Sequence, residues 1–292
     1  MALVQRSYRL RCYPNAAQIR MLNHWFGSVR WLWNHALEMR TKAYKRRKES
    51  ITGVDISRHV TRLKKLPRFS WLAKVPATCL TQCLRDQDRA FANFFRRVKA
   101  GATPGYPRFK ARQMVGSLRF QDVGPKWVKG MLVLPKLGTV KLAEILPKVE
   151  CPDTVTLKRD ADGRYYVTFS AEVDIAALPI ITGAVGIDLG IKHLAALSTG
   201  EKIDNPKRLA NRLRYLRQQQ RCLARRQPGS KRRERQRLRV ARAHSAVSNQ
   251  RNYAIHSLTT RLVRKHQIIC IEDLKVSNMI QHPRLARSIA DA

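Results

Sequence analysis

Residues 184–192 read Ala-Val-Gly-Ile-Asp-Leu-Gly-Ile-Lys, and the interpretation of the whole chain depends on them. Apolar side chains alternate with Gly186, Asp188 and Gly190, which is the period of a β-strand. An ionised Asp on a buried strand is unfavourable unless a cation or a hydrogen-bond network compensates its charge. The flanking glycines leave room for a metal or a phosphate. The stretch therefore predicts a strand that carries either a metal ligand or an Asp that faces solvent at the strand end.

The charge balance of the chain points to nucleic acid. In 292 residues, 58 Lys and Arg stand against 20 Asp and Glu, which gives a net charge of +38. Such an excess repels itself, and a polyanion is the simplest partner that neutralises it. No run of eighteen apolar residues exists, so no membrane partner is expected. The six cysteines form no C-x-x-C pair, so we expect no zinc site in this chain and a reducing cytoplasm.

Short alternating stretches predict a β-barrel built from residues 1–14 and 101–180. The expected strands cover residues 5–13, 117–123, 139–142, 154–159 and 164–173, with hairpins around residues 129–130 and 160–163.

Residues 15–100 predict a helical domain that interrupts this barrel. Asn15 is the expected N-cap of a first helix, and Gly27 predicts a break before a second helix. A shorter helix is expected at about residues 56–66, and a longer one begins at Pro76. The apolar side chains of the longer helix recur at helical spacing and predict a bundle core: Leu80, Leu84, Phe91, Phe94, Phe95 and Val98.

The loop at residues 101–110 mixes basic and aromatic side chains with two prolines that exclude a helix. Such a loop is suited to base stacking and phosphate binding. Tyr106, Arg108 and Lys110 are therefore candidate nucleic-acid contacts. A plain linker between domains is the alternative explanation of the loop.

Residues 205–265 hold 19 Lys and Arg and one acidic residue, Glu234, so they supply +18 of the net charge. Two helices joined by a turn at residues 228–230 are expected, with a thin apolar seam and arginine elsewhere. A surface helix normally mixes both signs of charge, and this ratio predicts a face that binds nucleic acid. The candidate contacts are Arg212, Arg221, Arg225, Arg232, Arg233 and Arg235.

A second strand of buried type is expected at residues 267–271, and it ends in Glu272 and Asp273. Two strands thus each deliver a carboxylate, with the basic hairpin between them. Phosphodiester hydrolysis by two metal ions uses carboxylates that hold the cations about 3.5–4 Å apart, and hard oxygen ligands favour Mg²⁺ or Mn²⁺. Asp188 and Glu272 are the candidate catalytic metal ligands. Asp273 is the more replaceable acid because it can cap the segment that follows.

Five motifs of the chain resemble the TnpB family, also called OrfB, of bacterial insertion-sequence proteins related to RNA-guided CRISPR effectors. The motifs are Tyr-Arg-Leu-Arg-Cys-Tyr-Pro-Asn at 8–15, Trp-Leu-Trp-Asn at 31–34, Tyr-Pro-Arg-Phe-Lys at 106–110, Gly-Ile-Asp-Leu-Gly-Ile-Lys at 186–192 and Ile-Glu-Asp-Leu at 271–274. The resemblance implies an α+β multi-domain protein. Its β-barrel, or wedge domain, is interrupted by a helical recognition domain. A ribonuclease H-like α/β domain of the RuvC type follows at residues 181–292 and contains the basic helical hairpin.

The resemblance further implies a Mg²⁺-dependent, transposon-encoded, RNA-guided DNA endonuclease of the bacterial cytoplasm, associated with the nucleoid. Its partners are a guide RNA derived from the transposon end and target DNA beside a short flanking motif. In such systems base pairing reads the sequence, while the protein grips the backbone and reads the short motif.

Family members continue beyond Glu272 with a four-cysteine zinc ribbon and a third catalytic Asp, neither of which occurs in these 292 residues. The active site at residues 181–292 is therefore expected to be incomplete and cleavage to be impaired. The alternative function is that of a catalytically inactive RNA-guided DNA-binding protein. A structural RNA-binding protein of the ribosomal kind is a third hypothesis, which the strand around Asp188 disfavours. The oligomeric state stays open.

Overall fold

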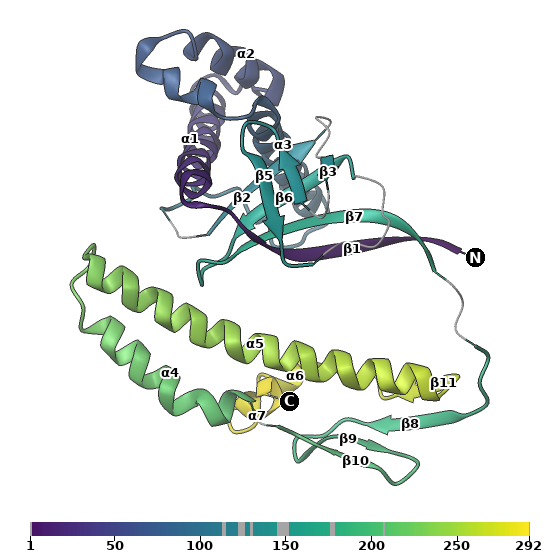
Figure 1. Cartoon of the computed structure of the whole chain (residues 1–292). Helices are drawn as coiled ribbons and strands as arrows, with labels where there is room; N and C mark the ends of the chain where they lie inside the picture. The colour runs from purple at the N-terminus through teal and green to yellow at the C-terminus, as the bar shows by residue number, and fades with distance from the viewer. Residues whose placement is uncertain are drawn as a thin grey trace. The chain divides into compact units, whose positions relative to one another are not determined.

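The chain forms two compact units, residues 1–175 and 176–292, and each has a hydrophobic core (Figure 1). The computed structural model describes residues 2–112, 115–121, 126–128, 131–144, 152–175, 179–206 and 208–291. The predicted hairpin turn around residues 129–130 lies outside these ranges.

Seven antiparallel strands form one sheet in the first unit, in the order β2-β6-β7-β1-β5-β4-β3. Their bounds are β1 Ala2–Tyr13, β2 Gly116–Gln121, β3 Lys126–Val128, β4 Met131–Leu134, β5 Gly138–Leu142, β6 Thr154–Arg159 and β7 Tyr165–Ile175. The sheet is curled, and β1 and β7 run along each other as a long ribbon (Figure 1). Among the described strands, β2 and β3 end the sheet without pairing to each other, so the predicted barrel is an open, curled sheet.

The tight turn between β6 and β7 confirms the hairpin predicted at residues 160–163. The Asp160 amide donates to the Arg164 carbonyl at 2.9 Å, and the Gly163 amide donates to the Asp160 carbonyl at 3.0 Å. Gly163 has a φ of 82°, a conformation that favours glycine.

The helices α1 (Ala16–Arg47), α2 (Gly53–Leu63) and α3 (Ala77–Lys99) lie between β1 and β2 in the chain. Asn15 caps α1 as predicted. Its side chain accepts a hydrogen bond from the Gln18 backbone amide, and the Gln18 side chain accepts one from the Asn15 backbone amide. The predicted break at Gly27 is wrong, since α1 is one continuous helix of 32 residues. The Ser28 hydroxyl donates to the His24 carbonyl at 2.9 Å, so it bonds within the helix rather than ending it.

A short 3-10 helix at Pro67–Lys74, which the sequence did not indicate, follows α2. The bundle core predicted along α3 covers only its first half. Leu80 and Leu84 are buried there, whereas Phe95 and Val98 in the second half of α3 are exposed, since helical spacing alone does not show how far along a helix its neighbours pack.

Helices and sheet of the first unit share one hydrophobic core, which includes Leu22 of α1, Leu84 of α3 and Phe120 of β2. The backbone of β2 approaches α1 so closely that a Cβ at Gly116 would stand 2.5 Å from the Phe26 ring. The division of this unit into a barrel and a helical domain stays a prediction.

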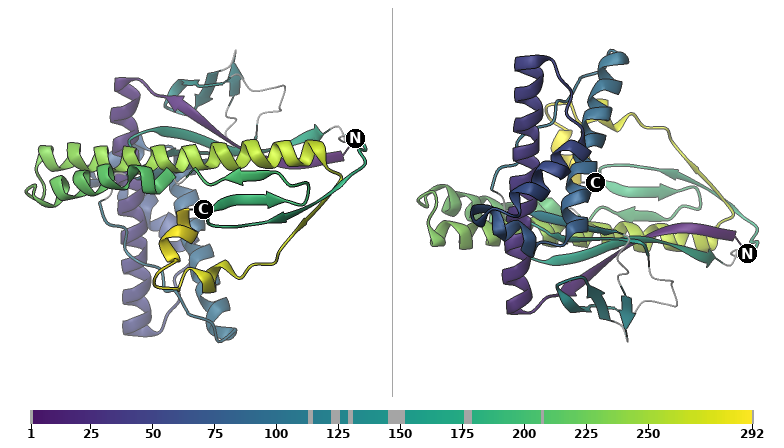
Figure 2. Two further views of the ribbon diagram at one scale, coloured as in Figure 1. Left: turned by 90° about the horizontal axis from the view of Figure 1, so that it is seen from below. Right: turned by 90° about the horizontal axis from the view of Figure 1, so that it is seen from above.

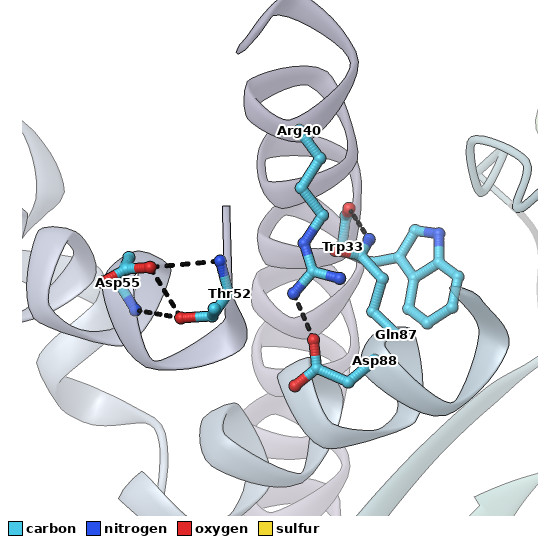
Figure 3. A network of polar contacts seen from close by, with 6 residues as sticks. All are labelled: Trp33, Arg40, Thr52, Asp55, Gln87 and Asp88. Atoms are coloured by element: carbon cyan, nitrogen blue, oxygen red, sulfur yellow. Dashed lines mark hydrogen bonds and ion pairs between the residues drawn. The ribbon is translucent and has the colours of Figure 1, made fainter. Parts of the chain in front are cut away.

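Polar contacts join α1 to α3, and a separate set of bonds fixes the start of α2 (Figure 3). Arg40 of α1 is buried and forms an ion pair with Asp88 of α3. The fully buried Gln87 donates to the Trp33 carbonyl at 2.8 Å. At the start of α2, Thr52 and Asp55 form a capping box that fixes the helix N-terminus.

Four strands form the sheet of the second unit, in the order β10-β9-β8-β11. Their bounds are β8 Ala184–Asp188, β9 His193–Leu197, β10 Lys202–Asp204 and β11 Ile268–Ile271. The first three strands pair antiparallel as a meander, and β11 returns parallel to β8. This order and these directions are those of the first four strands of a ribonuclease H-like sheet, so the predicted fold class is confirmed.

The prediction that residues 267–271 form a buried strand is wrong in part. β11 exists, but Ile268 and Ile271 are 57% and 67% exposed. Among the described strands β11 pairs only with β8, so one of its edges is open to solvent. An apolar run does not distinguish a central strand from an edge strand.

The basic segment forms the predicted helical hairpin from α4 (Arg208–Ala224) and α5 (Lys231–Lys265). Figure 2 shows the two helices, both in green, side by side in each view. Leu258 and Leu262 of α5 pack against Val185 and Ile187 of β8, so α5 covers one face of the four-stranded sheet. The short helices α6 (Val276–Met279) and α7 (Ala286–Asp291) follow β11. Among the described helices, none combines the length and apolar character that crossing a membrane requires.

Candidate metal centre and nucleic-acid interface

Asp188 and Glu272 lie at corresponding ends of two neighbouring parallel strands. Ile187 of β8 pairs with Ile271 of β11, and the two carboxylates are the next residues along each strand. The carboxyl ends of parallel strands are where open α/β sheets bind ligands. The parallel pairing thus brings together two acids that are about 80 residues apart in the sequence.

Both carboxylates lie on the face of the sheet that α5 does not cover. Val185 and Ile187 point into the core beneath α5 and are 1% and 9% exposed. Because side chains alternate along a strand, Asp188 points the opposite way, and it is exposed. Glu272 directly follows β11, is exposed, and lines the same hollow as Asp188.

A hollow of about 500 Å³ contains both carboxylates. Its other lining residues are Gly186, Ile187, Ala196, Leu197, Ser198, Cys270 and Ile271. The residues beside Asp188 in the hollow are small: Gly186 on its own strand, Ala196 on β9, and Ser198 directly after β9. This floor leaves the space above Asp188 open.

Ser198 holds the strand just before Asp188, a role that the sequence pattern did not reveal. The Gly186 amide donates to Ser198 Oγ at 3.0 Å, and the Ser198 amide donates to the Gly186 carbonyl at 2.9 Å. Both backbone groups of Gly186 are therefore fixed, which helps to fix the direction in which β8 presents Asp188, two residues later on the same face. Ser198 directly follows β9, and an alternating apolar stretch beside the strand of Asp188 was the only signal for it in the sequence.

The pair of acids has the chemistry of a divalent-cation site. Carboxylate oxygens are the ligands that Mg²⁺ and Mn²⁺ prefer, and within the described residues neither Asp188 nor Glu272 enters an ion pair. Asp273 does not line the hollow. Among the described residues, no group of three or more His, Cys, Asp and Glu side chains is arranged to hold a metal, so this hollow offers two acidic ligands.

Arginines of α4 border a hollow of about 790 Å³ along the hairpin. Arg214, Arg217 and Arg221 of α4 and Arg225 directly after its end recur every three or four residues, so they form one stripe that follows a face of α4. The stripe extends over about 16 Å of helix. A second hollow of about 440 Å³ at the hairpin tip is lined by Arg225, Arg226 and Arg232 together with Cys222, Gln227 and Ser230.

The six arginines predicted to bind nucleic acid fall into different positions. Arg221, Arg225 and Arg232 line these hollows, and Arg212 and Arg235 are exposed outside them. Arg233 turns back to α4 instead, where its Nη1 donates to the carbonyls of Leu223 at 2.9 Å and Arg226 at 2.7 Å.

Arg233 therefore caps the end of α4 and braces the turn of the hairpin. Arg214 and Arg217 were not among the predicted contacts, although their spacing from Arg221 was visible in the sequence.

The loop residues of the first unit also divide into two groups. Tyr106 and Lys110 contact side chains of the helices, and Arg108 is exposed. The neighbouring Phe109, which was not among the candidates, is 61% exposed.

Two family models match the chain. One, OrfB of IS605, described as "Probable transposase", matches residues 167–282, and the other, described as "Helix-turn-helix domain", matches residues 1–49. Within the described residues 2–49, the structure has the strand β1 and the continuous helix α1, without a turn between helices.

Curated proteins match over nearly the whole chain. A protein of Streptomyces pristinaespiralis named "Putative RNA-guided DNA endonuclease" is 38% identical over 296 residues, which is 100% of this chain and 72% of that protein. InsQ of Escherichia coli strain K12, named in the same way, is 28% identical over 94% of this chain and 67% of that protein. A solved Cas12f1–sgRNA–target DNA complex aligns over 99% of this chain and 86% of that chain, with a TM-score of 0.45 and 9% identity.

The residues that the two family models match include the motifs at residues 8–15, 186–192 and 271–274, and the relative from Streptomyces pristinaespiralis matches over the whole of this chain. The chain belongs to the OrfB/TnpB family of insertion-sequence proteins.

Proposed function

We propose that the chain is a transposon-encoded, RNA-guided protein that binds target DNA and that Asp188 and Glu272 hold Mg²⁺ or Mn²⁺ for its cleavage. One observation carries the proposal: the parallel pairing of β8 and β11 places both carboxylates in one open hollow, on the face that α5 leaves uncovered.

The residues of the hollow have distinct roles in this proposal. Divalent cations, when bound, activate the attacking water and stabilise the leaving oxygen of a phosphodiester. Asp188 and Glu272 supply the ligand oxygens, and the small floor formed by Gly186 and Ala196 admits a phosphate beside them. Ser198 is a positioning residue because it fixes the backbone of Gly186.

Two carboxylates alone hold a pair of cations loosely, so we expect weak cleavage from these 292 residues.

The arginine stripe of α4 supplies the nucleic-acid contact. Its four guanidinium groups suit a phosphate backbone, which requires cations but no base-specific groups. The names of the relatives from Streptomyces pristinaespiralis and Escherichia coli support an RNA guide and a DNA target. We propose that the guide derives from the transposon end, that the target carries a short flanking motif, and that the protein acts on DNA in the bacterial nucleoid.

Cleavage of target DNA tests the catalytic part of the proposal. The protein is combined with its cognate RNA, DNA with the flanking motif, and Mg²⁺ or Mn²⁺. We expect slow cleavage that is lost in Asp188→Asn and in Glu272→Gln and retained in Asp273→Asn, the matched control outside the hollow. Equal cleavage by the wild type and Asp188→Asn would refute a catalytic role of this site.

Alkylation of Cys270 tests metal binding without relying on activity. Cys270 is exposed and lines the same hollow as Asp188 and Glu272. Mn²⁺ held by the two carboxylates should slow the reaction of this thiol with iodoacetamide in the wild type but not in Asp188→Asn. Because Cys270 is exposed, its thiol is accessible to the reagent, and peptide mass spectrometry measures the rate of alkylation. If Mn²⁺ has the same effect on both proteins, the metal does not bind at this pair.

DNA binding without cleavage is the second candidate function. The arginine stripe favours it, because these side chains require neither Asp188 nor Glu272 to bind nucleic acid. Guide-dependent binding of target DNA by the wild type and Asp188→Asn with equal affinity, together with no cleavage by either protein, would establish this function.

A further inference from the structure

The loop at residues 101–112 is held rigidly against the helices of the first unit. Trp33 of α1 donates from its indole nitrogen to the Arg108 carbonyl at 2.9 Å. Asn34 of α1 makes two hydrogen bonds with the backbone of Lys110. Its side-chain nitrogen donates to the Lys110 carbonyl at 3.0 Å, and its side-chain oxygen accepts from the Lys110 amide at 2.8 Å. The backbone on both sides of Phe109 is therefore fixed.

The side chains of Tyr106 and Lys110 also attach the loop to the helices α1 and α3. The Tyr106 hydroxyl lies 3.2 Å from the Thr41 hydroxyl, and its ring meets the rings of Phe91 and Phe94 edge-on at 5.6 and 5.3 Å between centroids. The Lys110 ammonium stands 3.8 Å from the centre of the Trp33 ring. Two of the basic and aromatic residues of this loop thus hold it in place.

Phe109 is turned away from these anchors. Its side chain is 61% exposed, and among the described residues no other ring stacks on it. Scattered exposed apolar residues are common on proteins. Phe109 differs from them because its backbone is pinned on both sides and because exposed Arg108 precedes it directly and exposed Arg112 follows three residues later. A rigid ring between cations is the arrangement that proteins use to stack on single-stranded nucleic acid.

We propose that Phe109 stacks on one unpaired base, while Arg108 and Arg112 bind the adjoining phosphates. The ligand is an unpaired nucleotide, supplied either by a loop of the guide RNA or by an unwound DNA strand. This inference rests on the proposed function, because it assumes that the chain binds nucleic acid.

Fluorescence anisotropy with short oligonucleotides tests the stacking contact. Single-stranded RNA, single-stranded DNA and a blunt DNA duplex are titrated, without divalent metal, with the wild type, Phe109→Ala, Phe109→Leu and Phe109→Trp. Phe109→Ala should weaken single-strand binding about five- to hundredfold, which is the effect of removing one stacked ring, and leave duplex binding unchanged. Phe109→Leu should lose nearly as much affinity as Phe109→Ala, whereas Phe109→Trp should bind at least as tightly as the wild type.

The matched control is Phe95→Ala. Phe95 is an aromatic residue of similar exposure, 56%, on the second half of α3, and its ring contacts Phe94. This variant should bind every oligonucleotide as the wild type does. A loss confined to RNA with Phe109→Ala identifies the guide as the source of the base, and a loss with both single strands extends the contact to unwound DNA.

Three results would overturn the inference. The first is wild-type affinity of Phe109→Ala for both single strands. The second is equal weakening of single-strand and duplex binding, which would show a structural effect. The third is wild-type affinity of Phe109→Leu, which would show an apolar contact without stacking. If substitution of Arg217 and Arg221 on α4 also leaves every affinity unchanged, the proposed nucleic-acid function itself fails.

Discussion

Gly53 and Asp88 are so close that no side chain fits between them. A Cβ at Gly53 would stand 2.3 Å from one carboxylate oxygen of Asp88. The same carboxylate forms the ion pair with the buried Arg40, so α1, α2 and α3 meet at one charged group (Figure 3). The glycine at the start of α2 is therefore a requirement of packing.

Gly53→Ala should destabilise the first unit. The added methyl group must displace Asp88 from Arg40 or move the start of α2, and overpacking of this kind lowers the free energy of unfolding by about 1–3 kcal/mol. Urea unfolding followed by tryptophan fluorescence measures the effect, because all five tryptophans belong to residues 1–175.

Gly27→Ala is the matched control for this substitution. A Cβ at Gly27 would meet nothing within 4 Å, and the residue lies inside the continuous helix α1. Alanine should therefore stabilise the protein, by about 0.5–1 kcal/mol. Changes of the same sign at both glycines would contradict the contact between Gly53 and Asp88.

His35 should make the stability of the first unit dependent on pH. Burial lowers the pKa of His35 below its ordinary 6.5, and the positive charges of His59 and Lys42 lower it further, against the opposing effect of Glu38. The unfolded chain therefore takes up a proton that the folded chain still excludes. The free energy of unfolding contributed by His35 is fully present above pH 6.5 and falls as the pH drops from there to the lowered pKa.

His35→Gln removes this titration. Its urea midpoint should change less than that of the wild type between about pH 7.5 and pH 5.5. Substitution of the exposed His256 by Gln is the control and should leave the pH dependence of the first unit intact. A pH dependence that is equal in the wild type and His35→Gln would rule out His35 as the titrating group.

The cysteines should separate into two classes of reactivity. Burial raises the pKa of the Cys12, Cys79 and Cys83 thiols to about 12 each, so almost no thiolate exists near neutral pH. These three thiols should resist iodoacetamide in the folded protein, whereas the exposed Cys270 reacts readily. Peptide mass spectrometry in native buffer and in urea provides the measurement. Rapid native labelling of Cys79 or Cys83 would contradict the buried core between α1 and α3.

The arginine stripe of α4 should determine how strongly salt weakens DNA binding. Each phosphate contact contributes about 0.9 to the slope of log affinity against log salt on duplex DNA. The double substitution of Arg217 and Arg221 by Ala should therefore reduce the slope by up to about 1.8. Arg58→Ala, an exposed position on α2, is the control with the same kind of charge removed. An unchanged slope in the double variant would exclude the stripe from the DNA interface.

Local sequence patterns were sufficient to predict most strands and helices. Strict alternation around Asp188 indicated β8, and the charge ratio with the turn at residues 228–230 indicated the hairpin. The break expected at Gly27 was wrong because glycine signals weakness in a helix, while the surrounding core determines whether the helix actually ends. In α1, Leu22, Trp25 and Leu32 are all buried in one core on both sides of that position.

The candidate site depended on a relationship that no local pattern contains. Two apolar strands ending in acids were visible, but the parallel register of Ile187 with Ile271 follows from tertiary structure. The same limit applies to the roles of single residues. Tyr106 and Arg233 are residue types expected to contact nucleic acid. In the fold, however, Tyr106 contacts Thr41, and Arg233 donates to the carbonyls at the end of α4.

The parallel pairing of β8 with β11 makes the outer part of the basic hairpin, beyond the end of α5 that packs on the sheet, a modular insertion. The strands on either side of it, β10 and β11, are fixed by the sheet, so the length of the hairpin does not enter the geometry of the pocket around Asp188. The free energy of closing a loop grows by only about 0.6 kcal/mol for each doubling of its length. Selection is thus free to lengthen, shorten or recharge the part of the hairpin distant from the sheet to suit a different RNA, while Leu258 and Leu262 hold the end of α5 against β8 and the two carboxylates keep their register.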